Sequence, residues 1–226
     1  MMITTTRLPA ASLLRAAVLG LAALLAGCAA PENNVDYTAF RASRPASILV
    51  LPPLNESVEA GAGAAVLAQA TLPLAESGYY VVPVAVMDET FKQNGVHTAD
   101  DAQALPAAKL REIFGADAAL YLKVTQYGAS YAVLSSSVTV AVEGTLLDLR
   151  TGAKLWDGRK TIVYSSGGNG GGLIGMLVQA IVDQVVNTLS DRGFQVAGLA
   201  DQSLLGAGQP GGLLHGPRSP HYELLK

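Results

Sequence analysis

The sequence predicts an α/β fold of the α+β kind, in which helices pack on a sheet with a three-stranded antiparallel part. Two observations carry this prediction. Between residues 118 and 164, three strand-like segments of alternating or β-branched character follow one another, and a hairpin signal precedes the last. Ahead of them, a short apolar run at 47–51 precedes an alanine- and leucine-rich stretch at 60–77, a pattern typical of a strand followed by a helix.

The N-terminal segment has the build of a secretory signal. Residues 1–15 carry two arginines and no acid, and an apolar run follows at 16–26. This run is too short to span a membrane as a helix, which needs about twenty apolar residues. Small residues precede Cys28, the only cysteine of the chain. We therefore predict that residues 1–27 are a signal peptide, cleaved between Gly27 and Cys28.

Leu25-Ala26-Gly27-Cys28 resembles the lipobox of bacterial prolipoproteins. The resemblance implies that the Cys28 thiol is lipidated, with palmitate among the acyl chains, and that several chains make the membrane anchor permanent. The resemblance also implies the outer membrane, because Ala29, and not an aspartate, directly follows the lipidated cysteine. The alternative is an ordinary cleaved signal with an incidental cysteine.

Charge and composition exclude several classes of partner. Removal of residues 1–27 removes two arginines, so 13 basic residues face 18 acidic ones, a net charge of minus five. No basic patch for nucleic acid is expected. With Cys28 acylated, the remaining chain has no thiol for a disulfide or a metal. The sequence thus predicts no cofactor and no metal, and a core that depends on packing alone.

The chain then divides into a lipidated N-terminus and tether at 28–45, an α/β domain at 46–192 and an extended Gly/Pro-rich tail at 193–226. Within the tail, Leu213 and Leu214 are candidate docking contacts. The strand-like segments are 47–51, 79–84, 118–126, 131–149 and 154–164. The helix-like segments are 60–77, 86–93, 107–114 and 173–190.

Local signals set the ends of these elements. Pro73 should kink or restart the first helix, and Gly78 suits its left-handed cap. Pro83 removes a donor and places 79–84 at a sheet edge. Thr98 with Asp101 resembles a capping box. Pro106 and Gly115 fit the start and end of the helix at 107–114.

No catalytic residue is predicted. The Gly-rich stretch at 165–172 lacks the lysine of a phosphate-binding loop, and it is interpreted as a flexible connection. The chain has three histidines, and no two of them have a metal-ligand spacing. An envelope hydrolase or glycan-binding protein that uses Glu143 or an acid near Asp100 remains the alternative, although such acids usually just face water.

Two groups of residues are candidates for an interaction surface. Tyr121 falls on the non-core face of its predicted strand, and Tyr127 and Tyr131 follow it. Their alternative role is packing under helices on a second covered face. The helix at 173–190 is apolar around most of its circumference, which predicts burial in the core or in a homodimer. Its candidate contact residues are Leu177, Ile181 and Val185.

Four phrases of the sequence resemble a family of bacterial lipoproteins of unknown function that includes a meningococcal surface-antigen lipoprotein. They are PASILVLPPLNESVEA, LPLAESGYYVVPVAVMDETFKQNG, KLREIFGADAALYLKVTQYGASY and DLRTGAKLW. The resemblance implies a mixed sheet, a domain similar to the TolB amino-terminal domain and to the curli-secretion channel lipoprotein, and dimers. It transfers no catalytic residue.

The predicted function follows from the lipobox and this domain. We expect an outer-membrane lipoprotein, anchored through Cys28, whose domain is periplasmic or surface-exposed. Its role would be a non-catalytic binding or assembly component of an envelope transport or secretion system. The expected partners are the membrane, other envelope proteins including a curli-secretion-like lipoprotein, and a second copy of the chain.

Overall fold

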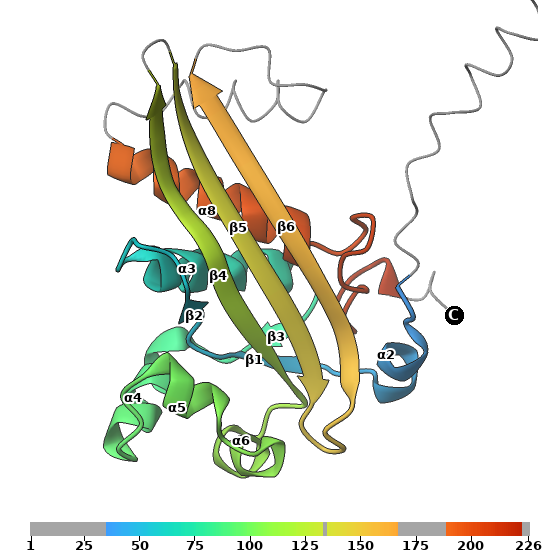
Figure 1. Ribbon diagram of the computed structural model, residues 1–226. Coiled ribbons are helices and arrows are strands. Elements are labelled where there is room, and N and C mark those ends of the chain that lie inside the picture. Colours follow the sequence, from blue (N-terminus) through green and yellow to red (C-terminus); the bar gives the residue numbers. More distant parts are fainter. Residues whose placement is uncertain (1–34, 133–134, 167–188, 223–226) are drawn as a thin grey trace, which may run out of the picture. The chain divides into compact units, whose positions relative to one another are not determined.

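The computed structural model describes residues 35–132, 135–166 and 189–222 (Figure 1). The predicted signal peptide and Cys28 therefore lie outside the described residues, as do most of the predicted helix at 173–190 and the Gly-rich stretch from residue 167. Residues from Val35 onward form one compact unit, described here by itself. Within the described ranges, no helix combines the length and the hydropathy that crossing a membrane requires.

The centre of the unit is a mixed sheet with the order β3-β1-β4-β5-β6, with β2 paired to β4 off this path. Strands β1, β2 and β3 run parallel to their neighbours, whereas β4, β5 and β6 are antiparallel to one another. The prediction of a mixed sheet with three antiparallel strands is confirmed. The strands are β1 Ser47–Val50, β2 Leu54–Asn55, β3 Tyr80–Val81, β4 Ala118–Ala132, β5 Ser135–Asp148 and β6 Lys154–Ser166.

Alternation of apolar residues explains the three long strands. Leu122 and Val124 of β4 and Val142 of β5 are almost fully buried on one face, and their neighbours along each strand are more exposed. The β4–β5 register shifts between Val124 and Gln126, so β4 alternates in the opposite phase beyond that point. At the hairpin before β6, Gly152 adopts the positive φ of +74° that was expected.

Helices cover both faces of the sheet. On one face, α3 and α8 pack together with Ile48, Leu120 and Trp156 in the larger apolar core. On the other, α4, α5 and α6 cover Leu49 and Ala119 in a smaller core. The helices are α2 Thr38–Ser43, α3 Ala62–Glu76, α4 Val84–Gln93, α5 Ala99–Gln103, α6 Ala107–Phe114 and α8 Leu189–Leu205.

The end signals of the short helices are confirmed. The Thr98 hydroxyl accepts the Asp101 backbone N–H at 3.1 Å at the start of α5. Pro106 precedes α6, and Gly115 closes it in the left-handed conformation. Helix α3, however, runs through Pro73 and does not stop there. A proline four or more residues from the helix start removes one hydrogen bond, and burial of Pro73 and Leu74 in the core compensates for that loss.

Two predicted boundaries are wrong. The tether was expected to reach residue 45, but α2 lies within it and Phe40 is 3% exposed in the larger core. The tail was expected to be extended from residue 193, but α8 continues to Leu205, and Val196 and Ala200 are fully buried. In both segments a few apolar side chains dock on the sheet, and this stabilises helices that the local sequence signals only weakly.

Candidate functional site

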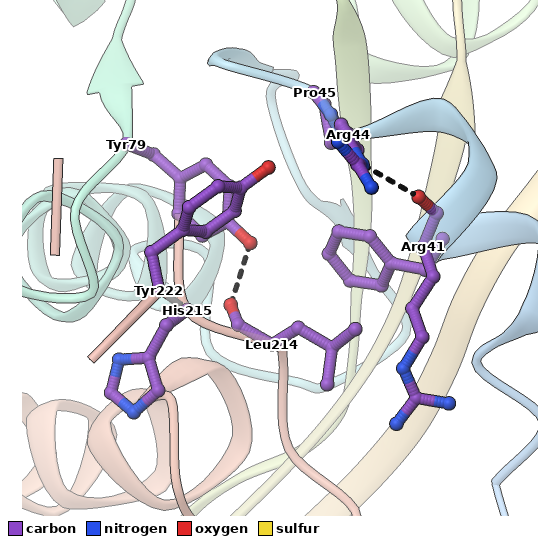
Figure 2. A pocket seen from close by; sticks show the side chains of 8 residues that line it. Arg41, Arg44, Pro45, Tyr79, Leu214, His215 and Tyr222 are labelled. Atoms are coloured by element: carbon purple, nitrogen blue, oxygen red, sulfur yellow. Dashed lines mark hydrogen bonds between the residues drawn. The ribbon is translucent and has the colours of Figure 1, made fainter. Parts of the chain in front are cut away.

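A cavity lies where α2 meets the C-terminal segment, and we call it the α2 cavity. It has a volume of about 320 Å³, and its walls are mainly apolar. Figure 2 shows Tyr79 and Tyr222 on one side and Arg41, Arg44 and Pro45 on the other. The lining residues are Phe40, Arg41, Arg44, Pro45, Tyr79, Leu214, His215 and Tyr222.

Helix α2 supplies the arginine side of this cavity. Phe40 points into the core and fixes the helix, which leaves Arg41 exposed. Arg44 ends the helix in the left-handed conformation, with φ of +46°, and its backbone N–H donates to the Phe40 carbonyl at 3.0 Å. This sharp end brings Arg44 and Pro45 to the mouth of the cavity together with Arg41. None of the described lining residues is acidic and two are arginines, so this part of the lining is positively charged.

The C-terminal segment supplies the opposite wall and is held by hydrogen bonds to aromatic side chains. The Tyr37 hydroxyl donates to the Gly212 carbonyl and the Tyr79 hydroxyl to the Leu214 carbonyl, each at 2.6 Å. The Trp156 indole N–H donates to the Gly211 carbonyl at 2.8 Å. Burial raises the pKa of Tyr79 far above its ordinary value, which keeps this hydroxyl a donor. The expected docking of Leu213 is confirmed, since it is 2% exposed.

A serine and two histidines lie beside this wall. Ser219 Oγ is 3.0 Å from His215 Nδ1 and accepts the His221 backbone N–H at 3.2 Å. Burial, and then the neighbouring His221, lower the pKa of His215, which favours its neutral form. Ser219 is 9% exposed, and no carboxylate of the described residues orients His215. A serine–histidine pair without an orienting acid lacks the third member of a hydrolytic triad.

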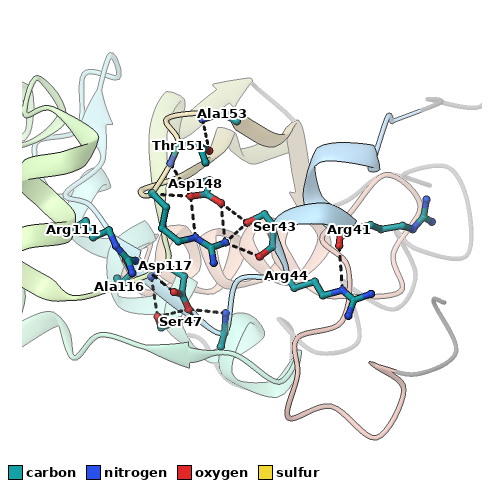
Figure 3. A network of polar contacts seen from close by, with 12 residues as sticks. Arg41, Ser43, Arg44, Ser47, Arg111, Ala116, Asp117, Asp148, Thr151 and Ala153 are labelled. Atoms are coloured by element: carbon teal, nitrogen blue, oxygen red, sulfur yellow. Dashed lines mark hydrogen bonds and ion pairs between the residues drawn. The ribbon is translucent and has the colours of Figure 1, made fainter.

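A polar network fixes the C-terminal end of α2 to the sheet (Figure 3). Asp148 is 2% exposed, and its carboxylate accepts hydrogen bonds from Ser43 Oγ at 2.6 Å and Arg150 Nη2 at 2.9 Å. Burial acts to raise the pKa of Asp148, but these bonds and the backbone N–H donors of Arg150 and Thr151 outweigh it, so the pKa is well below its usual range. The Asp117 carboxylate similarly accepts hydrogen bonds from the backbone N–H and the hydroxyl group of Ser47. The network therefore positions the chain on both sides of Arg44.

The aromatic interaction surface predicted on β4 is largely an interior surface. Tyr121 is half-buried against the smaller core, so its alternative role of packing under helices is the one observed. Tyr127 packs against the larger core and approaches Gly193 of α8. Tyr131 belongs to β4, but its side chain is not among those that the structure describes. Leu177, Ile181 and Val185 also lie outside the described residues.

The acids considered for hydrolysis do not meet at a site. Glu143 of β5 lies opposite Lys123 on β4 and Arg159 on β6, in a cross-strand row of charges. Asp100 is in the exposed first turn of α5. Neither lines the α2 cavity. Within the described ranges, no group of three or more His, Cys, Asp or Glu residues could hold a metal ion.

A second feature is the outer side of β6. In the described part of the chain this strand pairs only with β5, so no strand pairs with its other edge, although α2 contacts β6. Ile162 and Tyr164 face the core, whereas the alternate residues Asp157, Arg159, Thr161 and Val163 are exposed, and Val163 is 60% exposed. An unpaired strand edge is a common surface for binding another chain.

Sequence reasoning missed the α2 cavity because its two walls were assigned to a tether and a tail. One signal could have found it. The tether combines two aromatic residues, Tyr37 and Phe40, three positions apart, which is helical spacing. The tail combines the leucine pair with an arginine and two histidines. Neither composition suits a segment that only spans solvent.

Comparison with known proteins agrees with the fold. Residues 35–218 match the family described as "Putative lipoprotein GNA1162-like". A Neisseria meningitidis serogroup B protein described as "Putative lipoprotein NMB1124/NMB1162" is 48% identical over 204 residues, which cover 89% of this chain and 95% of that protein.

Two solved structures are also similar. The crystal structure of lipoprotein GNA1162 from Neisseria meningitidis is 50% identical, with a TM-score of 0.54, over 64% of this chain and all of that one. The PelC dodecamer from Paraburkholderia phytofirmans is 16% identical over 70% of this chain and 87% of that one, with a TM-score of 0.40, which supports no functional conclusion. On its sequence match and its close relative, the chain belongs to the GNA1162-like lipoprotein family.

Proposed function

We propose that this protein is an outer-membrane lipoprotein, anchored through acylated Cys28, that acts by binding other envelope proteins in a transport or secretion assembly. Membership of a lipoprotein family supports the anchor. The lipobox-like sequence at residues 25–28 supplies the attachment site, and the domain is displayed in the periplasm or at the cell surface.

The observation that carries the binding role is the open edge of β6 with its exposed alternate residues. Strand β6 has 13 residues, and among the described residues no strand pairs with its second edge, which can therefore accept a further strand. Val163 adds an exposed apolar contact beside that edge. By contrast, the polar groups of the α2 cavity offer no nucleophile with an oriented base, which favours binding over catalysis.

Crosslinking in cells tests the binding role. A photoreactive phenylalanine analogue at Val163, expressed at native abundance, should give discrete adducts that contain other envelope proteins. The matched control is the same analogue at Val86, which is 54% exposed on α4 and distant in sequence from the open edge. Adducts that contain only this chain would indicate a homodimer through β6. Recovery of the protein alone at both positions would contradict the proposal.

A further inference from the structure

We propose that the α2 cavity binds an anionic phospholipid of the membrane that holds the lipid anchor. The arginines would contact the headgroup, and the apolar wall would contact part of an acyl chain. This inference rests on the proposed function, because it uses the anchor at Cys28 to bring the cavity to the membrane.

The length of the tether limits how far the cavity can be from the membrane. Six residues lie between Cys28 and Val35, where the described domain begins, so seven Cα–Cα steps separate the two. Fully extended, they span at most about 25 Å. Val35 packs against the larger core, and Tyr37 bonds to Gly212 beside the cavity wall. The lipid anchor therefore leaves the domain close to the α2 cavity.

The charge of this face is opposite to that of the domain as a whole. The described residues contain 12 Lys and Arg against 15 Asp and Glu. The segments 35–46 and 207–222, which form the cavity and its surroundings, contain Arg41, Arg44 and Arg218 against the single acid Asp36. A positive face on a negative domain, next to a lipid anchor, complements an anionic bilayer.

The arginines beside the cavity are not paired with carboxylates of the described residues, although Arg41 lies 5.9 Å from the centre of the Tyr37 ring and Arg44 Nε donates to the Arg41 carbonyl at 3.4 Å. None of Arg41, Arg44 and Arg218 forms an ion pair with a carboxylate among the described residues. Arg41 and Arg44 are exposed, and both line the cavity. Guanidinium groups bind phosphate oxygens through paired N–H donors. Two of them at one opening form a receptor for a phosphodiester.

The interior of the cavity suits hydrocarbon. Phe40 and Tyr79 are 3% and 4% exposed, and Leu214 completes the wall between them. A cavity of about 320 Å³ is in the range of small-molecule sites and large enough for part of an acyl chain. Apolar walls below a pair of cations match an amphiphile with an anionic head better than a soluble anion, which would gain nothing from the walls.

The test uses the mature lipidated protein, reconstituted into bilayers that contain a trace of phosphatidylglycerol with a photoreactive group in its acyl chain. After illumination, mass spectrometry should locate the label on peptides that contain Phe40 or Leu214. Phosphatidylcholine with the same photoreactive chain should label these peptides at least fivefold less. The double variant Arg41→Glu with Arg44→Glu should lose the difference between the two lipids.

The matched control is Lys92→Glu with Lys109→Glu, which makes the same change in net charge on α4 and α6, outside the cavity. It should keep the preference. A second variant, Leu214→Trp, fills the cavity without altering charge and should abolish labelling there. Equal labelling of these peptides by phosphatidylglycerol and phosphatidylcholine would overturn the proposal. So would an equal loss of the lipid preference in the double lysine control.

The mass of the N-terminal peptide reports separately whether Cys28 is acylated. An unacylated peptide would contradict the proposed anchor. In that case, the same labelling with vesicles added in solution still decides whether the cavity prefers the anionic lipid.

Discussion

At the scale of single residues, the contact between Gly78 and the C-terminal segment decides whether the α2 cavity has its second wall. Gly78 has φ of +93°, and a Cβ there would lie 2.3 Å from the Ser219 backbone nitrogen. Its carbonyl accepts the Arg218 N–H at 3.1 Å, and Gly216 N–H donates to the Ser77 carbonyl at 2.8 Å. Only a residue without a side chain permits this approach.

We therefore expect Gly78→Ala to lower the free energy of unfolding by about 3 kcal/mol or more, because the cost of a left-handed backbone adds to a clash with backbone atoms. Gly95→Ala is the matched control. Gly95 has φ of +76° but no atom within 4 Å of its Cβ position, so it should lose only about 1 kcal/mol. Urea unfolding measures both. Equal losses would mean that the C-terminal segment does not pack on Gly78 in solution.

At the scale of elements, α2 is held to the β5–β6 hairpin mainly through Asp148, and this attachment should depend on pH. Hydrogen bonds keep the pKa of Asp148 below its ordinary value despite its burial, so folding favours the deprotonated form. Its stabilisation is complete above the unfolded-state pKa of about 3.9 and is lost as the pH falls below that value toward the folded pKa.

We expect Asp148→Asn to lower the free energy of unfolding at pH 7 by about 2 kcal/mol, because charge-assisted bonds from Ser43 and Arg150 are weakened. The variant should also lose less stability than the parent between pH 4 and pH 2, a range in which the stabilisation by the Asp148 carboxylate is being lost. Denaturant unfolding across this range measures the difference. The control Asp88→Asn removes an exposed carboxylate bonded only to Lys92 and should follow the parent. Parallel pH profiles for Asp148→Asn and the parent would contradict this role.

Elements with strong local signals were the ones that the sequence could predict. The alternation along β4, β5 and β6, the cap at Thr98 and the stop at Gly115 act within a few residues, and the structure confirms them. Helix α2 has six residues and no side-chain cap, and α8 contains polar residues and two glycines. Such helices form because distant residues cover them, which local patterns cannot show.

The same reason explains why the candidate site could not be predicted. Its walls come from residues 40–45, 79 and 214–222, and only the folded sheet brings these segments together. The aromatic residues predicted as a surface on β4 follow the period-two alternation of a strand. That alternation does not show which face of the sheet a helix will cover. Tyr121 and Tyr127 proved to be packing residues on opposite sides of the β4 register shift.

At the scale of the whole molecule, the tether determines how often the domain meets the membrane surface. A random-coil chain of seven Cα–Cα steps, the number from Cys28 to Val35, has a root-mean-square span of about 15 Å, and an insertion of about 14 Gly and Ser residues after Asn34 would raise this to about 26 Å. The effective concentration of the cavity at the bilayer falls with about the −3/2 power of the tether length. Tripling the tether should therefore reduce labelling of the Phe40 peptide by about fivefold at trace amounts of the photoreactive anionic lipid.

An equal insertion between Asn94 and Gly95, an exposed loop after α4, lengthens the chain without lengthening the tether, so it should leave the labelling unchanged. If the two insertions gave the same labelling in proteins acylated alike, the anchor would not be what brings the α2 cavity to the lipid.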